Sequence, residues 1–235
     1  MEHIFGPSTE EKLFLEGPQS RLKELRFAIK VFREFIRGFR ALHFIGPSVT
    51  VFGSARFTEG HPFYALARQI GSKLPSLGLT VITGGGPGVM EAANRGAFDA
   101  GANSIGLNIT LPHVQYPNPY ITPDLCFRFR YFALRKLHFL LRARALVAFP
   151  GGYGTLDELF GTLTLVQTRA IRPVPIVLVG ERYWRRAVDV NFLVDEGMID
   201  REDQELFCYA ETAPEIWNTI LAWHRANGTP LFPAA

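Results

Sequence analysis

Short apolar runs alternate with longer amphipathic segments along most of this chain, and this alternation constrains its fold more than any other feature. The runs at 49–53, 79–83, 104–109 and 145–149 are short and rich in Val, Ile and Leu, as expected of strands buried on both faces. Helical periodicity recurs between such runs, which is typical of strands that lie parallel in one sheet. We therefore predict an α/β fold with a Rossmann-like, doubly wound parallel sheet and helices on both faces. Further strands are expected at 175–179 and 207–210, and helices at 64–77, 88–100, 131–142, 155–168, 184–196 and 214–226.

The chain has 235 residues, enough for one large domain, which we place at residues 48–235. Residues 1–47 are predicted to form an N-terminal extension with a flexible lead-in, 1–20, and an amphipathic helix, 21–44. We expect that helix to pack on the domain or on a partner subunit rather than on a membrane. Its basic residues far outnumber its acidic ones. Its apolar side chains recur at three-and-four spacing: Leu22, Leu25, Ile29, Phe32, Ile36 and Phe39.

Composition excludes several classes of protein. The net charge is +3 and the pI about 9.0, a bias that fits an anionic ligand but is too weak to indicate nucleic acid. Two cysteines, Cys126 and Cys208, predict ordinary thiols in a reducing, cytoplasmic environment. Charged residues interrupt any leader segment, and no apolar run reaches the ~18 residues of a membrane span. The six histidines lack paired spacing, so we expect no metal site.

Residues 150–158, Pro-Gly-Gly-Tyr-Gly-Thr-Leu-Asp-Glu, join the predicted strand 145–149 to a helix. Glycines at such a junction leave backbone amides unshielded at the positive end of a helix dipole, which is a receptacle for phosphate. Glu158 follows within the helix, and a carboxylate beside a phosphate-binding site indicates chemistry on a phosphorylated small molecule. An alternative is equally favoured by the spacing: Thr155 and Glu158 could form a capping box, with Glu158 returning a hydrogen bond to the Thr155 amide.

Two other glycine-rich segments follow predicted strands, Gly53-Ser54 after the first and residues 84–90 after the second. Neither matches the dinucleotide fingerprint or the Walker A pattern. Loops that follow parallel strands share one edge of the sheet, so they suit a ligand with one phosphate. The alternative is that the glycines only make tight turns and close helix–strand contacts.

Arg135 lies on the predicted helix 131–142, just before the strand that leads into the phosphate loop. Its guanidinium could hold a phosphate or a ribose hydroxyl through paired donors. The alternative is a solvated surface charge.

Together these motifs resemble the Lonely Guy family, whose members are typically cytokinin riboside 5′-monophosphate phosphoribohydrolases and were often labelled lysine decarboxylases. Residues 150–158 fit every fixed position of the family's P-G-G-x-G-T-x-x-E segment, and Arg135-Lys136 supplies its upstream pair. The resemblance covers about residues 48–222, and the N-terminal helix is similar to that of the longer bacterial branch. Two departures concern the substrate: Phe132 stands where a methionine is usual, and Val114 replaces an acidic residue of the loop after the third strand.

The resemblance implies hydrolysis of the N-glycosidic bond of a purine nucleoside 5′-monophosphate by a homodimer or larger homo-oligomer, with no cofactor. It implies Glu158 and Arg135 as catalytic residues. The residues implied in substrate binding are Gly53, Ser54, Gly85, Gly86, Gly88, Met90, Lys136, Gly151, Gly152, Tyr153, Gly154, Thr155 and Thr164.

Three alternatives remain open. The substrate could be plain AMP or a cytokinin nucleotide with an N6-isoprenoid tail, for which Leu111, Val114, Phe132 and Phe139 could supply an apolar pocket. The protein could instead bind or carry a phosphorylated ligand without catalysis, as molybdenum-cofactor carriers do. A decarboxylase would need a lysine that binds pyridoxal phosphate, and neither Lys73 nor Lys136 has a recognisable context for that role.

Overall fold

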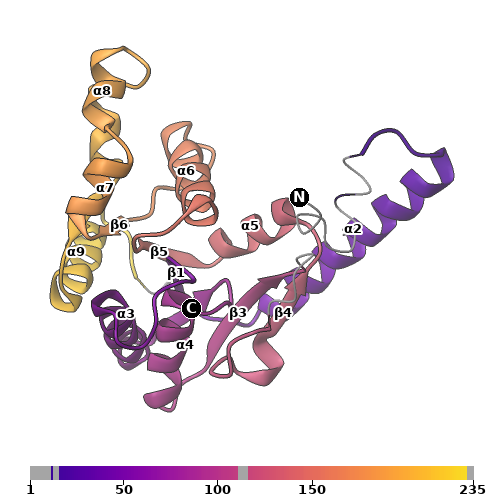
Figure 1. Cartoon of the computed structure of the whole chain (residues 1–235), viewed down its shortest axis with the longest axis horizontal. Coiled ribbons are helices and arrows are strands. Elements are labelled where there is room, and N and C mark those ends of the chain that lie inside the picture. Colours follow the sequence, from indigo (N-terminus) through magenta and orange to yellow (C-terminus); the bar gives the residue numbers. More distant parts are fainter. Residues whose placement is uncertain (1–11, 13–15, 111–115, 232–235) are drawn as a thin grey trace, which may run out of the picture.

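The computed structural model describes residue 12 and residues 16–110 and 116–231. A single sheet of seven strands, all parallel, forms its centre, in the order β4-β3-β2-β1-β5-β6-β7 (Figure 1). The predicted α/β fold with a doubly wound parallel sheet is therefore confirmed. The strands are β1 (Ser48–Phe52), β2 (Thr80–Thr83), β3 (Ser104–Ile109), β4 (Cys126–Phe129), β5 (Ala143–Ala148), β6 (Ile176–Val179) and β7 (Cys208–Ala210).

Helices cover both faces of the sheet because successive strand residues point to opposite sides. In β5, Ala145 and Val147 belong to one hydrophobic cluster, while Leu146 and Ala148 belong to the other. The first cluster packs against α3 (Pro62–Lys73), α4 (Val89–Asp99) and α9 (Ala213–Ala226). The second packs against α5 (Phe132–Leu140), α6 (Tyr153–Gln167) and α7 (Glu181–Ala187). The shorter elements are η1 (Leu74–Leu77), η2 (Pro123–Leu125), α8 (Val190–Asp195) and η3 (Arg201–Leu206).

The strand order reverses between β1 and β5, and this switch point positions the candidate site. From β1 the chain moves outward through β2 and β3 to β4, and then returns to place β5 on the other side of β1. Phe52 pairs with Ala148 at the carboxyl ends of these two strands, and the helices that follow, α3 and α6, pack against opposite faces of the sheet. Ligands of doubly wound sheets bind in the crevice at such a point.

Two elements differ from the sequence-based prediction. Strand β4 was not predicted, because its sequence, Cys-Phe-Arg-Phe, is short and only Phe129 is fully buried at this edge of the sheet. The single helix predicted at 184–196 is in fact two helices, α7 and α8. The chain breaks between them because the Asp189 side chain caps α8, accepting a hydrogen bond from the Phe192 amide at 3.0 Å.

The N-terminal helix forms as α2 (Arg21–Leu42), close to the predicted bounds. Its rings lie against α5, with Phe27 at 4.9 Å from Tyr131 and Phe35 at 5.8 Å from His138 between ring centroids. At Gly38 an added Cβ would collide with the His138 ring, so only glycine allows this close approach. The three-and-four face was expected to pack on the domain or on a partner subunit. Its Phe39 ring contacts the domain, 5.7 Å from the His138 ring between centroids, and packing on a partner subunit stays a prediction. The residues of this face are exposed in the single chain: Leu22, Leu25, Ile29, Phe32, Ile36 and Phe39.

Some predictions concern residues that the structure does not describe. The proposed apolar contributions of Leu111 and Val114, and most of the lead-in 1–20, lie outside the described residues. Among the helices of the described residues, none combines the length and the hydropathy needed to cross a bilayer.

Candidate active site

A cavity of about 940 Å³ opens at the switch point, between the loops that follow β1 and β5 and the helices α5 and α6. It brings together most of the residues that the sequence predicted for a site. Those that line it are Gly53, Ser54, Met90, Arg135, Gly151, Gly152, Tyr153, Gly154, Thr155 and Glu158. The structure thus brings together the loop after β1, the loop after β5 and the α5 arginine, while the predicted loop after β2, residues 84–90, contributes only Gly84 and Met90 to the lining.

The N-terminus of α6 faces this cavity. Gly152 is the N-cap residue, and no side chain caps the helix. The first amides of a helix have no carbonyl one turn earlier to bond to, so they are available to a ligand. A Cβ added at Gly152 or Gly154 would meet no atom within 4 Å, which shows that space is open beside these amides. The amide of Thr155 is already used, because it donates to the Gly152 carbonyl at 2.9 Å.

Neighbouring loops hold this helix terminus in place. The Ser54 amide donates to the Pro150 carbonyl at 2.9 Å, which ties the loop after β1 to the loop after β5. The Tyr183 hydroxyl of α7 donates to the Gly151 carbonyl. A Cβ at Gly151 would collide with the Thr155 hydroxyl, so this position needs glycine for packing. The amides are thus positioned before any ligand arrives, which lowers the entropy cost of binding.

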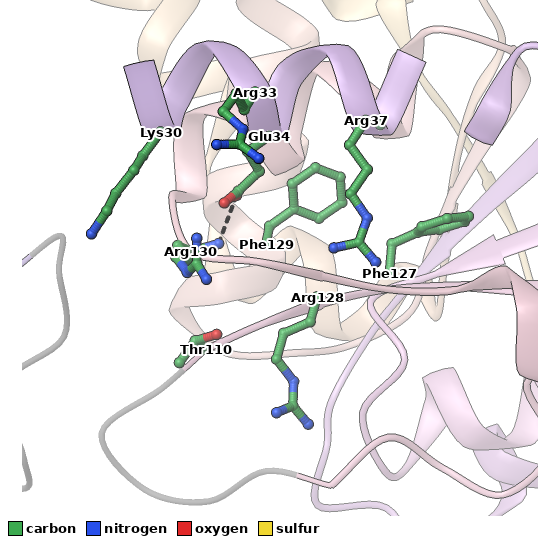
Figure 2. Close-up of a pocket in the computed structure, with 10 residues that line it drawn as sticks. Lys30, Arg33, Glu34, Arg37, Thr110, Phe127, Arg128, Phe129 and Arg130 are labelled. Carbon is green, nitrogen blue, oxygen red and sulfur yellow. Dashed lines mark hydrogen bonds between the residues drawn. The ribbon is translucent and has the colours of Figure 1, made fainter. Parts of the chain in front are cut away.

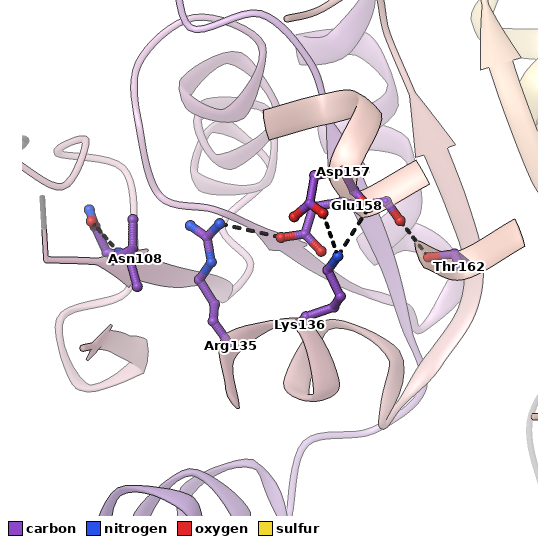
Figure 3. Close-up of polar contacts among 7 residues, drawn as sticks. Asn108, Arg135, Lys136, Asp157, Glu158 and Thr162 are labelled. Carbon is purple, nitrogen blue, oxygen red and sulfur yellow. Dashed lines mark hydrogen bonds and ion pairs between the residues drawn. The ribbon is translucent and has the colours of Figure 1, made fainter. Parts of the chain in front are cut away.

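Glu158 and Arg135 form an ion pair inside the cavity (Figure 3). Arg135 Nη2 lies 3.3 Å from Glu158 Oε1, with 12% of the Arg135 side chain and 4% of the Glu158 side chain exposed. Phe132 and Phe139 flank the guanidinium, at 5.0 and 5.4 Å from its carbon to their ring centroids. Arg135 is therefore not the solvated surface charge that the sequence left open, since it is held between two rings and aimed at the carboxylate.

Burial raises the pKa of Glu158 above its ordinary value, and the nearby charges of Arg135 and then Lys136 act against that rise. The carboxylate is thus desolvated yet offset by positive charge. A desolvated anion interacts strongly with any positive charge that develops in front of it, because little water screens the interaction.

The capping-box alternative for Glu158 is wrong. The helix begins at Tyr153, two residues earlier than predicted, so Thr155 lies inside the first turn and is not the N-cap. Glu158 directs its carboxylate to Arg135, and its backbone carbonyl accepts a hydrogen bond from the Thr162 hydroxyl at 2.8 Å. The Glu158 carboxylate therefore lies in the cavity and does not cap the helix.

Three predicted glycines lie outside the cavity lining: Gly85, Gly86 and Gly88. Gly85 and Gly88 have φ of +70° and +73°, a backbone conformation that glycine adopts most readily. At Gly88 a Cβ would collide with the Ser54 carbonyl, which accepts a hydrogen bond from the Val89 amide at 3.0 Å. Both glycines thus have the turn and packing role that the sequence offered as an alternative.

Lys136 and Thr164 also lie outside the lining of the cavity. Lys136 Nζ contacts Asp157 Oδ1 at 2.8 Å and the Asp157 carbonyl at 3.1 Å, so it joins α5 to α6 (Figure 3). Thr164 donates its hydroxyl to the Phe160 carbonyl at 2.8 Å within α6 and is exposed.

The sequence did not indicate the aromatic cluster that also lines the cavity. Phe57 and His61 stack with ring centroids 3.9 Å apart, and both line the cavity with Phe63. They lie in the segment that joins β1 to α3 and at the start of that helix. Because β1 ends at the switch point, the position of this loop was the available signal.

Neither a metal site nor a cofactor lysine is found at this cavity. Among the described residues, no group of three His, Cys, Asp or Glu side chains could hold a metal ion. None of the described residues that line the cavity is a lysine. A pyridoxal phosphate enzyme forms its Schiff base on a lysine, so the described cavity lining does not provide for that chemistry.

A sequence model of the family described as "Possible lysine decarboxylase" matches residues 90–220, more than half of the chain. The chain therefore belongs to this family, which is the one that the glycine-rich motif and the Arg135-Lys136 pair indicated.

Curated relatives include a protein of Escherichia coli K12 named pyrimidine/purine nucleotide 5′-monophosphate nucleosidase, 30% identical over 182 residues. That match covers 70% of this chain but only 37% of the longer relative. A cytokinin riboside 5′-monophosphate phosphoribohydrolase of Arabidopsis thaliana is 30% identical over 155 residues, covering 64% of this chain and 70% of the relative.

Solved structures share the fold. A structural-genomics protein, TM1055, superposes with a TM-score of 0.58 at 24% identity, covering 75% of this chain and 99% of its own. A molybdenum cofactor binding protein of Rippkaea orientalis gives a TM-score of 0.54 at 21% identity, covering 77% of this chain and 98% of its own. At these identities the likeness concerns the fold alone.

Proposed function

We propose that the protein is a phosphoribohydrolase that cleaves the N-glycosidic bond of a purine nucleoside 5′-monophosphate, giving free base and ribose 5-phosphate. One observation carries this proposal: the buried Glu158–Arg135 pair lies in the same cavity as the uncapped N-terminus of α6. The helix terminus is suited to a phosphate, and the carboxylate is suited to a cationic transition state.

The phosphate binds to the first-turn amides at Gly152, Tyr153 and Gly154. Glu158 lies five residues after Tyr153, or about 7.5 Å along the helix axis at 1.5 Å per residue. A ribose and its 5′-carbon occupy that interval, so a phosphate at the terminus places the sugar ring in front of the carboxylate. Phosphate binding energy is thereby used to position a bond that is remote from the phosphate.

Breaking the bond from C1′ to the base nitrogen develops positive charge on C1′ and the ring oxygen. The Glu158 carboxylate stabilises that charge and orients the attacking water, whose oxygen bonds to C1′ as the base leaves with the bonding electron pair. Water supplies the proton that the departing base takes up. Arg135 keeps Glu158 ionised and contributes donors to the ribose or phosphate.

Three named relatives support the class of reaction. The Escherichia coli protein is named a nucleotide 5′-monophosphate nucleosidase, and proteins of Arabidopsis thaliana and rice are named cytokinin riboside 5′-monophosphate phosphoribohydrolases or probable ones. The base is left open between adenine and an N6-modified adenine. Phe132 and Phe139 line the cavity and supply apolar surface for either.

The test is a nucleotide panel with a phosphate control. AMP, GMP, CMP, dAMP and isopentenyl-AMP are incubated with the protein, and free base is measured by chromatography beside the corresponding nucleosides. We expect base release from at least one 5′-monophosphate and far slower release from its nucleoside, because the nucleoside cannot use the α6 amides.

The variant Gly152→Val tests the phosphate-binding site itself. Its side chain would enter space that is empty in the wild-type protein, so the fold should persist while phosphate access is blocked. Equal rates on nucleotide and nucleoside, or wild-type affinity of Gly152→Val for ribose 5-phosphate, would contradict phosphate binding at the α6 N-terminus. No base release from any nucleotide would make a carrier of a phosphorylated ligand the better description.

We also propose that the protein works as a homo-oligomer, with the outer face of α2 at a subunit interface. Support comes from the exposed residues Leu22, Leu25, Ile29, Phe32, Ile36 and Phe39, whose spacing of three and four is that of a coiled-coil seam. More exposed apolar side chains lie on α5 and α6, among them Leu137 and Phe160.

A cytoplasmic location is proposed from the two thiols. Cys126 lies in β4 and Cys208 in β7, the two edge strands, so they are too far apart to bridge within one chain. Burial raises the pKa of Cys208 to about 11 and raises that of Cys126, so both thiols stay protonated and unreactive.

A further inference from the structure

The segment between β1 and α3, residues 53–61, brings two polar side chains to the cavity of the candidate active site that take no part in the mechanism proposed above. Arg56 and His61 both line that cavity, together with the glycines of the loop after β5. The segment is tied to this loop at its start, because a Cβ on Gly151 would lie 3.1 Å from the Ser54 amide nitrogen. The Arg56 amide in turn donates to the Ser54 hydroxyl at 3.1 Å. The backbone that carries Arg56 is therefore fixed beside the start of the phosphate loop.

Arg56 carries a positive charge that no acidic residue offsets. Among the described residues that line the cavity, the only Arg, Lys, Asp or Glu residues are Arg56, Arg135 and Glu158, and the last two pair with each other. Within the part of the chain that the structure describes, no carboxylate lies within ion-pair distance of the Arg56 guanidinium. Arg56 thus gives the lining one uncompensated positive charge.

His61 offers a hydrogen-bond donor to the same cavity. Its Nδ1 accepts a hydrogen bond from the Phe63 amide at 3.2 Å, so Nδ1 carries no proton and Nε2 carries one. Nε2 has no hydrogen-bond partner among the described residues. The ring is held by stacking on Phe57, 3.9 Å away between centroids. Phe63 extends this cluster to the phosphate loop, because a Cβ on Gly180 would lie 2.8 Å from the Phe63 ring and 3.3 Å from Pro150.

A phosphate monoester needs more positive charge than the terminus of α6 supplies. The N-terminus of a helix is equivalent to about half a positive charge, whereas a phosphate monoester carries about −1.5 to −2 at pH 7. The Arg135–Glu158 pair is neutral as a unit, so it leaves this difference unchanged. The single charge of Arg56 supplies most of the difference, and the His61 donor adds to it.

We propose that Arg56 and His61 are specificity-determining residues of the phosphate site, and that they select a dianionic phosphate monoester over monoanionic esters. This inference rests on the proposed function, which places the same phosphate at the N-terminus of α6. The guanidinium binds phosphate oxygens through paired donors, and the His61 Nε2–H donates to a further oxygen. A sulfate ester has nearly the same shape as a phosphate ester but one negative charge fewer, so it binds more weakly.

The test is calorimetric titration of the full chain with ribose 5-phosphate and ribose 5-sulfate at neutral pH and low salt. Neither compound has a base to release, so binding is measured without turnover. We expect the phosphate ester to bind at least about fivefold more tightly, the effect of one unit charge about 4 Å from another even in bulk water. Arg56→Gln should weaken ribose 5-phosphate binding about tenfold or more and should remove most of the preference over the sulfate. A merely structural role of Arg56 would weaken both esters equally.

His61→Asn separates the two roles of His61. Asparagine is a favoured N-cap residue and keeps an acceptor for the Phe63 amide, but its shorter side chain cannot bring a donor to the same place. We expect a melting temperature close to that of the wild type and ribose 5-phosphate binding at least about fivefold weaker. Wild-type affinity in His61→Asn would overturn the role of His61.

The control variant comes from a second cavity, of about 810 Å³, between α2 and β4 (Figure 2). Arg37 lines it, and none of the described residues that line it also lines the active-site cavity. Arg37→Gln removes the same charge and should leave ribose 5-phosphate affinity within about twofold. Equal losses in Arg56→Gln and Arg37→Gln, or an unchanged preference for phosphate over sulfate in folded Arg56→Gln, would overturn this inference alone. Failure of the wild type to bind ribose 5-phosphate, or undiminished binding by Gly152→Val, would overturn the phosphate site at α6 and both proposals with it.

Discussion

Replacing Arg135 by methionine should raise the pKa of Glu158 and so reduce the fraction of ionised carboxylate at neutral pH. Methionine keeps most of the apolar volume between Phe132 and Phe139 but removes the charge. Burial already raises the pKa of Glu158, and Arg135 is the largest influence acting against burial. Its removal leaves a buried carboxylate with less compensation, which favours the protonated form.

The geometry sets the size of the effect. Two unit charges 3.3 Å apart attract by about 5 kcal/mol at an effective dielectric constant of about 20. Water that enters the space of the lost guanidinium recovers part of this energy. If the net loss after this compensation is only about a quarter to a third of the 5 kcal/mol attraction, the proton affinity of Glu158 still rises about tenfold, since tenfold corresponds to about 1.4 kcal/mol.

The assay is an NMR titration of the protein labelled with ¹³C at glutamate carboxyls, with Glu158→Gln used to assign the resonance. It reads the carboxyl directly and needs no turnover. Lys136→Met is the matched control, because it also removes one positive charge on α5, but that charge pairs with Asp157. We expect a smaller rise in that variant. An unchanged Glu158 titration in folded Arg135→Met, or a larger rise in Lys136→Met, would refute the pairing described here.

Three further predictions concern stability and assembly. Because the folded-state pKa of Glu158 is raised, ionisation of Glu158 destabilises the fold, and stability is lost as pH rises through that pKa. The melting temperature of Glu158→Gln minus that of the wild type should therefore increase from pH 4 to pH 8. A decrease of this difference would mean that the folded-state pKa is lowered. Gly88→Ala should cost about 3 kcal/mol or more in denaturant unfolding, since it combines positive φ with a backbone collision, and Gly154→Ala, in open space, should cost under about 1 kcal/mol; similar values would refute this account. Ile29→Glu/Phe32→Glu should lower the mass measured by light scattering in solution, and an unchanged oligomer would remove α2 from the interface.

The sheet and the phosphate loop were predictable because their signals are local. Strands buried on both faces read as continuous apolar runs, and the end of β5, residues 145–148, has that form. The glycine-rich residues 150–158 follow it almost directly, which marks the junction of a strand and a helix. The boundary of α6 was less predictable. A shift of two residues moved Thr155 from the cap into the first turn, and this shift decided between two roles for Glu158.

Features that depend on contacts between distant segments could not be read in the same way. The periodicity of α2 revealed an apolar face, but it did not show that the helix meets the domain mainly through Phe27, Phe35 and Gly38. Gly85 and Gly88 looked like ligand-binding glycines, and only their φ values and neighbours show that they serve the turn before α4. The same holds for β4, whose short sequence becomes a strand by pairing with β3.

Release of free base from a nucleoside 5′-monophosphate by the wild type and by Glu158→Gln tests the central claim most directly. Glutamine keeps the size of the side chain but cannot carry negative charge. The account predicts base and ribose 5-phosphate in equal amounts from the wild type. It also predicts at least about a hundredfold loss of turnover in a folded Glu158→Gln that still binds ribose 5-phosphate. Undiminished turnover in that variant would contradict the role of the buried carboxylate.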